Sequence, residues 1–211
     1  MMLFVKEDAD VYFLGTTFLV HKDGYLLTVA HILTKRDNLM VVPIGVQDDF
    51  SPLSLDTVTP FLVKIAQIDE ERDTALLKFQ DDVNLSAPDH IIGNSAETLV
   101  GSTVAAIGYP YGYEKLHSQF ILEAVVSSKI VSQNETRLLL FDTMIQGGFR
   151  GGPLVNVSDG RVVGLVSGRF DPLKVTRNIT KDSQQYSTNI SYAVAIEYGA
   201  DLMDKEGLTV V

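Results

Sequence analysis

Short apolar runs, several of them alternating with polar residues, recur along the whole chain and are separated by Gly, Asp, Asn and Pro. A period of two is typical of β-strands, and the separating residues favour turns. The pattern predicts twelve strands, six in each half of the chain. They cover residues 2–6, 11–20, 25–30, 39–46, 61–68, 74–79, 103–107, 119–126, 137–145, 153–156, 162–169 and 190–195.

Turn and helix signals lie between these runs. Gly24 and Gly160 each follow an aspartate, and such Asp-Gly pairs predict hairpin turns because glycine adopts positive φ freely. Residues 30–34 fit a single helical turn, and residues 196–205 fit a short helix that ends before a glycine.

The order of the elements predicts an all-β fold. The polar stretch 80–94 is typical of a linker, and the polar stretch 171–189 is typical of a surface loop. Twelve strands, six on each side of this linker, together with the sequence blocks described below, lead us to expect a double six-stranded antiparallel β-barrel with a short C-terminal helix. The N-terminal barrel falls within residues 1–85 and the C-terminal barrel within residues 95–211, and together they form one unit.

The composition limits the cellular compartments and the classes of binding partner that we expect for the protein. The 211 residues include no cysteine, which indicates a reducing compartment or a core that needs no disulfide. The formal net charge of −10 argues against nucleic acid and against an anionic membrane as partners. The segment 1–8 turns acidic too soon for a signal peptide, so we expect a cytoplasmic location, or a secreted or periplasmic one if the chain has been trimmed.

Three sequence blocks carry candidate chemistry. Residues 26–31 read Leu-Leu-Thr-Val-Ala-His and follow a Gly-Thr-Thr-Phe-Leu-Val block at 15–20. Residues 73–78 read Asp-Thr-Ala-Leu-Leu-Lys. Residues 142–154 read Asp-Thr-Met-Ile-Gln-Gly-Gly-Phe-Arg-Gly-Gly-Pro-Leu. Taken alone, His31 is better explained as a partly buried histidine at a strand end, and Asp73 is equally well explained as part of a solvated turn.

Together, in this order, the blocks resemble those of chymotrypsin-fold serine peptidases of the HtrA type. Residues 93–112 and 190–196 resemble two further blocks of that group, so the resemblance covers nearly the whole chain. It implies that His31 is the general base and that Asp73 orients it. It also implies that residue 150 stands at the nucleophile position, and that the N–H groups of Gly148 and residue 150 form the oxyanion hole.

The chain departs from this pattern in one loop. Arg150 stands where the nucleophilic serine is expected, Gly147 where proline is expected and Phe149 where asparagine is expected. A guanidinium stays protonated and has no lone pair with which to attack a carbonyl carbon. The sequence therefore predicts a catalytically inactive serine peptidase homologue that acts as a peptide-binding, protein-binding or regulatory module.

Two alternatives remain open at this point. The chain is a nucleophile-position variant of an active intracellular serine endopeptidase, or it is a peptidase with a remodelled site. For the guanidinium of Arg150, the possible partners are Asp73, a surface acid or an anionic ligand, and the last of these would make the pocket a carboxylate-binding site.

The resemblance also implies where a bound side chain would lie. The residue six places before the nucleophile position forms the base of the specificity pocket, and here it is Met144. The pocket walls are then expected from Leu165, Val166, Ser167 and Gly168. Such an apolar slot would take a small or medium apolar side chain. The alternative is that Met144 packs in the core of the second barrel.

No metal or cofactor is expected. The histidines, at positions 21, 31, 90 and 117, lack the spacing of metal ligands. The expected partner is a peptide or protein ligand in the cleft, and the sequence makes no prediction of the oligomeric state.

Overall fold

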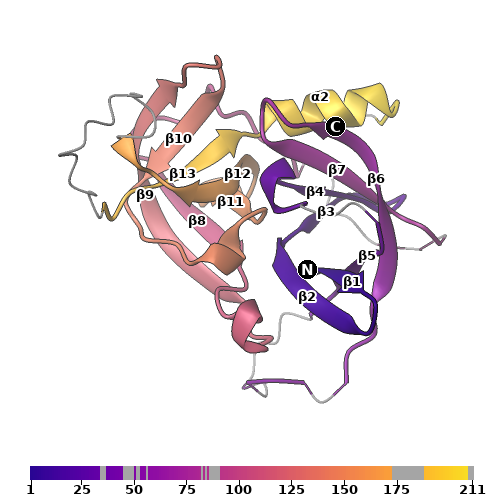
Figure 1. Cartoon of the computed structure of the whole chain (residues 1–211). Helices are drawn as coiled ribbons and strands as arrows, with labels where there is room; N and C mark the ends of the chain where they lie inside the picture. The colour runs from indigo at the N-terminus through magenta and orange to yellow at the C-terminus, as the bar shows by residue number, and fades with distance from the viewer. Residues whose placement is uncertain are drawn as a thin grey trace, which may run out of the picture.

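The strands of the N-terminal half form one antiparallel sheet, in the order β2-β1-β5-β6-β7-β4-β3 (Figure 1). Its apolar face, together with the C-terminal helix, makes one buried cluster of side chains. The strands are β1 (Met2–Glu7), β2 (Asp10–Thr16), β3 (Phe18–His21), β4 (Tyr25–Thr28), β5 (Leu39–Val42), β6 (Phe61–Asp69) and β7 (Thr74–Phe79). The structure is a computed structural model that describes residues 1–33, 37–44, 50, 53–55, 57–81, 83, 85, 91–172 and 188–208.

The predicted strand 11–20 is two strands, so the prediction of six strands in the first half was wrong. The chain turns at Thr17, whose hydroxyl donates to the carbonyl of Leu27 (2.8 Å) and whose N–H donates to the carbonyl of Met1 (3.0 Å). β2 and β3 therefore lie at opposite edges of the sheet, although they follow each other in the chain. The sheet curls into a half-barrel that brings these edges together at Thr17. Threonine is itself a good strand former, so the pattern gives no sign of the break.

The C-terminal half forms a closed barrel of six antiparallel strands, in the order β10-β13-β12-β11-β8-β9, as predicted. The barrel closes because β9 pairs with both β8 and β10. Its strands are β8 (Thr103–Gly108), β9 (Phe120–Val131), β10 (Arg137–Phe141), β11 (Pro153–Asn156), β12 (Val162–Arg169) and β13 (Ser191–Ala195). Its interior is a second cluster of buried aliphatic and aromatic side chains.

The C-terminal helix joins the two halves. Helix α2 (Glu197–Lys205) leaves β13 of the barrel and packs on β6 and β7 of the first sheet, so the predicted helix is confirmed. A Cβ on Gly199 would lie 2.7 Å from Cδ1 of Leu27, which shows how closely the helix approaches the sheet. Leu202 and Met203 are buried in the cluster of the first sheet.

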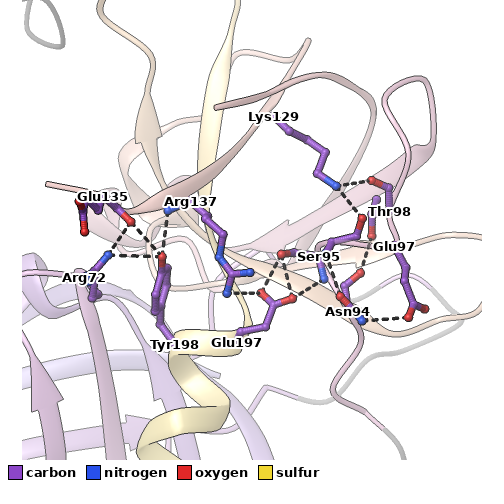
Figure 2. A network of polar contacts seen from close by, with 11 residues as sticks. Arg72, Asn94, Ser95, Glu97, Thr98, Lys129, Glu135, Arg137, Glu197 and Tyr198 are labelled. Atoms are coloured by element: carbon purple, nitrogen blue, oxygen red, sulfur yellow. Dashed lines mark hydrogen bonds and ion pairs between the residues drawn. The ribbon is translucent and has the colours of Figure 1, made fainter. Parts of the chain in front are cut away.

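A polar network reinforces this junction (Figure 2). Tyr198 on α2 lies between two guanidinium groups. Its ring centroid is 5.2 Å from Cζ of Arg72 and 5.4 Å from Cζ of Arg137. Its hydroxyl accepts from the N–H of Arg137 (3.1 Å) and donates to the carbonyl of Glu135 (3.3 Å). Arg72 also donates to that carbonyl (2.5 Å). The network thus ties the β6–β7 turn and the β9–β10 turn to the same helix.

The remaining predicted elements have mixed outcomes. Gly24 and Gly160 have φ of +81° and +73° and lie in turns, as predicted. The helical turn predicted at 30–34 is the 3₁₀ helix η1 (Ala30–Ile32). Residues 82, 84 and 86–90 of the predicted linker 80–94, and residues 173–187 of the predicted loop 171–189, lie outside the described residues.

Candidate active-site cleft

A cleft of about 1140 Å³ is lined by residues from both sheets. The first sheet contributes His31, which follows β4, and Asp73, which precedes β7. The barrel contributes Ser167 of β12 and Arg150, which follows the 3₁₀ helix η3 (Gly147–Phe149). Residues that are far apart in the sequence therefore meet in one cavity.

The structure brings His31 and Asp73 into direct contact. Nδ1 of His31 lies 3.0 Å from Oδ1 and 2.9 Å from Oδ2 of Asp73, and the backbone N–H of His31 donates to Oδ1 (2.9 Å). The side chains are 40% and 23% exposed, so the pair lies at the cleft surface. The carboxylate thus holds Nδ1 as the protonated nitrogen and leaves Nε2 as the basic one, which is the arrangement that a general base requires.

Asp73 is held by contacts from both sides of the cleft. Its backbone has φ of +54°, a left-handed conformation that aspartate tolerates better than most residues. The hydroxyl of Ser167, on the barrel, donates to Oδ2 of Asp73 (2.7 Å). The preceding turn is tied to the barrel as well, because Nδ2 of Asn134 donates to the carbonyl of Glu71 (2.7 Å). The orientation of His31 therefore depends on how the two sheets are joined.

The loop that carries Arg150 is closed by its own backbone. The N–H of Phe149 donates to the carbonyl of Gln146 and the N–H of Arg150 to the carbonyl of Gly147, both at 3.1 Å. The N–H of Gly152 donates to the carbonyl of Phe149 (2.9 Å). The N–H of Arg150, which sequence analysis assigns to the oxyanion hole, is therefore engaged within the loop.

The loop is also packed tightly against its surroundings. A Cβ on Gly148 would lie 1.9 Å from the carbonyl oxygen of Tyr109, and a Cβ on Gly152 would lie 2.1 Å from that of Ile107. Gly151 has φ of +83°, and a Cβ there would lie 2.1 Å from Oγ1 of Thr28. Real Cβ atoms do not approach so closely, so glycine is required at these positions of the loop.

Thr16 at the end of β2 connects this loop to the first sheet. Its hydroxyl donates to the carbonyl of Gly148 (2.7 Å) and its N–H donates to the carbonyl of Arg150 (2.8 Å). Thr16 belongs to the 15–20 block that carries the resemblance, although the sequence pattern predicts no role for it. The contacts fix the backbone on both sides of the Arg150 side chain.

The residues expected to form the specificity pocket divide into three groups. Ser167 and Gly168 line the cleft. Leu165 and Val166 are buried in the two hydrophobic clusters and do not line it. Met144 is 41% exposed and is absent from the lining, so the structure supports neither the pocket base nor the packed core residue expected there.

Ile145, which sequence analysis missed, lines the cleft instead of Met144. It is 3% exposed, and its N–H donates to Oγ of Ser191 (3.2 Å). Ser191 in turn donates to the carbonyl of Thr143 (2.6 Å), which fixes the direction of this segment. Adjacent side chains in an extended segment point in opposite directions, so a shift of one residue in the count exchanges a lining side chain for an exposed one.

Two tyrosines beside the loop have raised pKa values. Burial raises the pKa of Tyr109, whose side chain is fully buried, to about 12. Burial also raises the pKa of Tyr113, and the positive charge of Arg150 acts in the opposite direction. Arg150 therefore lies close enough to Tyr113 to affect its ionisation. The Tyr113 hydroxyl donates to the carbonyl of Leu14 (3.1 Å).

Among the described residues, no group of three or more His, Cys, Asp or Glu side chains is placed to hold a metal ion. Within the same part of the chain, none of the helices has the length and apolar character needed to cross a membrane.

Comparison with known proteins identifies the family. Residues 15–165 match the family model for the trypsin-like peptidase domain, and this segment contains the whole His31, Asp73 and Arg150 arrangement. The chain therefore belongs to the trypsin-like peptidase domain family.

Its relatives include serine proteases of the HtrA and DegP type. The chain is 32% identical over 160 residues to the magnetosome formation protease MamE of Paramagnetospirillum magneticum, covering 75% of this chain and 20% of that protein. It is 30% identical over 196 residues to the probable periplasmic serine endoprotease DegP-like of Hahella chejuensis, covering 90% of this chain and 35% of that protein. The chain thus spans between a fifth and about a third of the length of these relatives.

Solved structures show the same fold. The HtrA-type protease AlgW with a decapeptide superposes with a TM-score of 0.68 at 23% identity, over 93% of this chain and 52% of that one. AlgW with a tripeptide gives a TM-score of 0.70 at 22% identity, over 99% of this chain and 60% of that one. The predicted chymotrypsin-like all-β fold is therefore confirmed, with a half-barrel of seven strands in place of the first six-stranded barrel.

Proposed function

We infer that this chain is a catalytically inactive trypsin-like peptidase homologue whose cleft binds a peptide or protein ligand. The observation that carries the proposal is the lining of the cleft, where His31 and Asp73 are present together with Arg150. In this assignment His31 is the base, Asp73 orients it, and Arg150 takes the place of the nucleophile. A base without an adjacent hydroxyl or thiol cannot form an acyl-enzyme.

The backbone of the loop supports the same conclusion. In an active peptidase, backbone N–H groups point at the developing oxyanion. Here the N–H of Arg150 donates to the carbonyl of Gly147, so it is not directed at a substrate. Loss of one oxyanion donor costs about 10²–10³ in kcat. Two separate features of the loop therefore oppose catalysis.

The proposals of a peptide ligand and of a location outside the cytoplasm are based on the proteins to which this chain is similar. The AlgW structures are described with a decapeptide and a tripeptide, which favours a peptide as the ligand of this chain. The DegP-like relative is described as periplasmic, and the relatives give no support to the cytoplasmic location expected from the sequence. We place this chain outside the cytoplasm, and its recovery in the cytoplasmic fraction of the source cells would contradict that location.

The intact contact between His31 and Asp73 favours one alternative. An inactive scaffold does not need a histidine oriented for proton transfer, whereas an active serine endopeptidase does. In this alternative the chain is a nucleophile-position variant of an active enzyme.

The Arg150→Ser substitution tests both readings. We expect the unmodified chain to show no labelling by a fluorophosphonate probe and no casein hydrolysis. We expect Arg150→Ser to gain slow labelling that is lost in the Arg150→Ser/His31→Ala double variant, with casein hydrolysis still absent because the loop is closed. Labelling of the unmodified chain would contradict the proposal. Rapid casein hydrolysis by Arg150→Ser would favour the alternative.

The binding part is tested separately with a peptide array probed by the unmodified chain. We expect retention of a subset of peptides that share an apolar residue. Failure to retain any peptide would contradict a peptide-binding cleft.

A further inference from the structure

We propose that the Arg150 end of the cleft is a carboxylate-binding site, in which the guanidinium receives the carboxylate of a bound peptide. The inference rests on the proposed peptide-binding function and names the chemical group that is recognised. The planar guanidinium offers a fork of donors that matches the two oxygens of a carboxylate.

The first observation is that the backbone of Arg150 is fixed while its side chain is not engaged. Its carbonyl accepts from the N–H of Thr16 (2.8 Å) and its N–H donates to the carbonyl of Gly147 (3.1 Å). Within the described part of the chain, its guanidinium has no hydrogen bond and no ion pair, and the residue is exposed. The side chain is thus presented from a rigid base with its donors free for a ligand.

The second observation concerns Asp73, an acid that could otherwise pair with the guanidinium of Arg150. Asp73 lines the same cleft, but both of its carboxylate oxygens lie against Nδ1 of His31, and Oδ2 also accepts from Ser167. The backbone N–H of His31 also donates to Oδ1, so three donors engage the two oxygens of this carboxylate. Of the intramolecular partners that the sequence left open for the guanidinium, Asp73 is therefore already engaged.

The third observation is a second guanidinium in the same lining. Arg169 at the end of β12 is exposed, and its Nε donates to the carbonyl of Ile145 (3.4 Å). The same lining includes Arg72, which is engaged with Glu135 and Tyr198, and the acidic residues Glu70, Glu71 and Asp171, of which Glu70 and Asp171 have interactions of their own. Arg150 and Arg169 thus provide two exposed guanidinium groups in one cleft, and the guanidinium of Arg150 is the one without a partner in the described part of the chain.

The ligand is recognised through side chains. The N–H of Arg150 donates to the carbonyl of Gly147 and is therefore not available to the ligand. The carboxylate is bound by the guanidinium instead. Phe170 and Tyr192 line the same cleft, are partly exposed and provide apolar ring surface. The matching ligand has a carboxylate next to an apolar residue, as at the C-terminus of a peptide, and an acidic side chain offers the same chemistry.

Fluorescence polarisation with three labelled peptides tests the proposal on the full chain. The first is fluorescein-Gly-Ala-Ala-Val-Leu with a free C-terminal carboxylate, and the second is its C-terminal amide. The third is the amide with Glu in place of Leu, which supplies the carboxylate from a side chain. We expect the free carboxylate to bind at least about tenfold more tightly than its amide, as a charge-assisted hydrogen bond implies. Comparison of the first and third peptides decides whether the site prefers a C-terminal carboxylate or the carboxylate of an acidic side chain. The peptide that binds more tightly identifies the preferred group.

Variants at the site make the test specific. Arg150→Ala is expected to reduce the affinity for the carboxylate peptide to that of the amide, and Arg150→Lys to give an intermediate loss because the charge remains without the fork. Arg161→Ala removes an exposed arginine that does not line the cleft, and no change is expected. The thermal unfolding midpoint of Arg150→Ala should equal that of the unmodified chain.

The possible results distinguish the carboxylate-binding site from the peptide-binding function on which it rests. Equal affinity for the carboxylate peptides and the amide, or tight carboxylate binding that survives Arg150→Ala, would overturn the carboxylate site and leave peptide binding standing. No binding of any of the three peptides would overturn the carboxylate site and would also count against the peptide-binding cleft.

Discussion

The two sides of the cleft are held by different kinds of interaction. On the side of the first sheet, His31 and Asp73 are held by hydrogen bonds between side chains, including one from Ser167 across the cleft. On the barrel side, the loop before Arg150 is held by its own backbone and by glycines packed against carbonyl groups. The polar side has what acid–base chemistry requires, whereas the loop side has a fixed backbone that presents an arginine.

Neither side of the cleft depends on the side chain at position 150. The loop path is set by glycine packing and by Thr16, and neither depends on the side chain at position 150. The contact between His31 and Asp73 likewise makes no use of that side chain. The fold therefore accommodates arginine at position 150 together with an intact contact between His31 and Asp73.

The largest effect is expected from Gly148→Ala on the loop side. The new Cβ would lie 1.9 Å from the carbonyl oxygen of Tyr109, so the loop must shift, and we expect a loss of about 4 kcal/mol or more in the free energy of unfolding. Gly147→Ala is the matched control, because its Cβ would lie 3.4 Å from Tyr113, an ordinary contact. Urea unfolding followed by circular dichroism measures both. Equal stability of the two variants would show that the loop is not held by packing.

A smaller effect is expected on the polar side. Asp73→Ala removes the acceptor of three hydrogen bonds and places alanine at φ of +54°, and we expect a loss of about 2–3 kcal/mol. Asp73→Asn keeps an acceptor for the N–H of His31 and tolerates this backbone, so about 1 kcal/mol is expected. In both variants the downfield proton resonance of Nδ1–H of His31 should be lost. An unchanged stability for Asp73→Ala would indicate that the pair contributes nothing to the fold.

The smallest effect at neutral pH is expected from Tyr109→Phe beneath the loop. The Tyr109 hydroxyl is buried and has no hydrogen-bond partner in the described structure, so its removal should stabilise the protein by about 1 kcal/mol. Equal or lower stability of Tyr109→Phe at pH 7 would indicate that the hydroxyl is satisfied.

The same substitution predicts a pH dependence. Burial raises the pKa of Tyr109 from 10 to about 12, so between these values the unfolded chain has released a proton that the folded chain still holds. The contribution of Tyr109 to stability is therefore complete below pH 10 and is lost as the pH rises towards 12, by about 3 kcal/mol in total. Urea unfolding of both proteins from pH 8 to pH 11 should show the difference in their stabilities widening above pH 10. A constant difference would contradict the raised pKa.

The sequence by itself determined most of the strands and the family. Strand patterning is a local property, and blocks such as 26–31 and 73–78 combine a strand with a chemically active residue at its end. The fold class, the closed second barrel and helix α2 followed from these patterns. The identity of residue 150 was likewise readable from the sequence, and with it the expectation that catalysis is lost.

Tertiary structure decided the features that depend on contacts between distant segments. The break at Thr17 depends on hydrogen bonds to Leu27 and Met1. The exchange of Met144 for Ile145 in the cleft depends on Ser191, which fixes which side of an extended segment faces inward. No local pattern contains this information, because a rotation of one residue along an extended chain costs little until a partner from elsewhere in the fold selects one side.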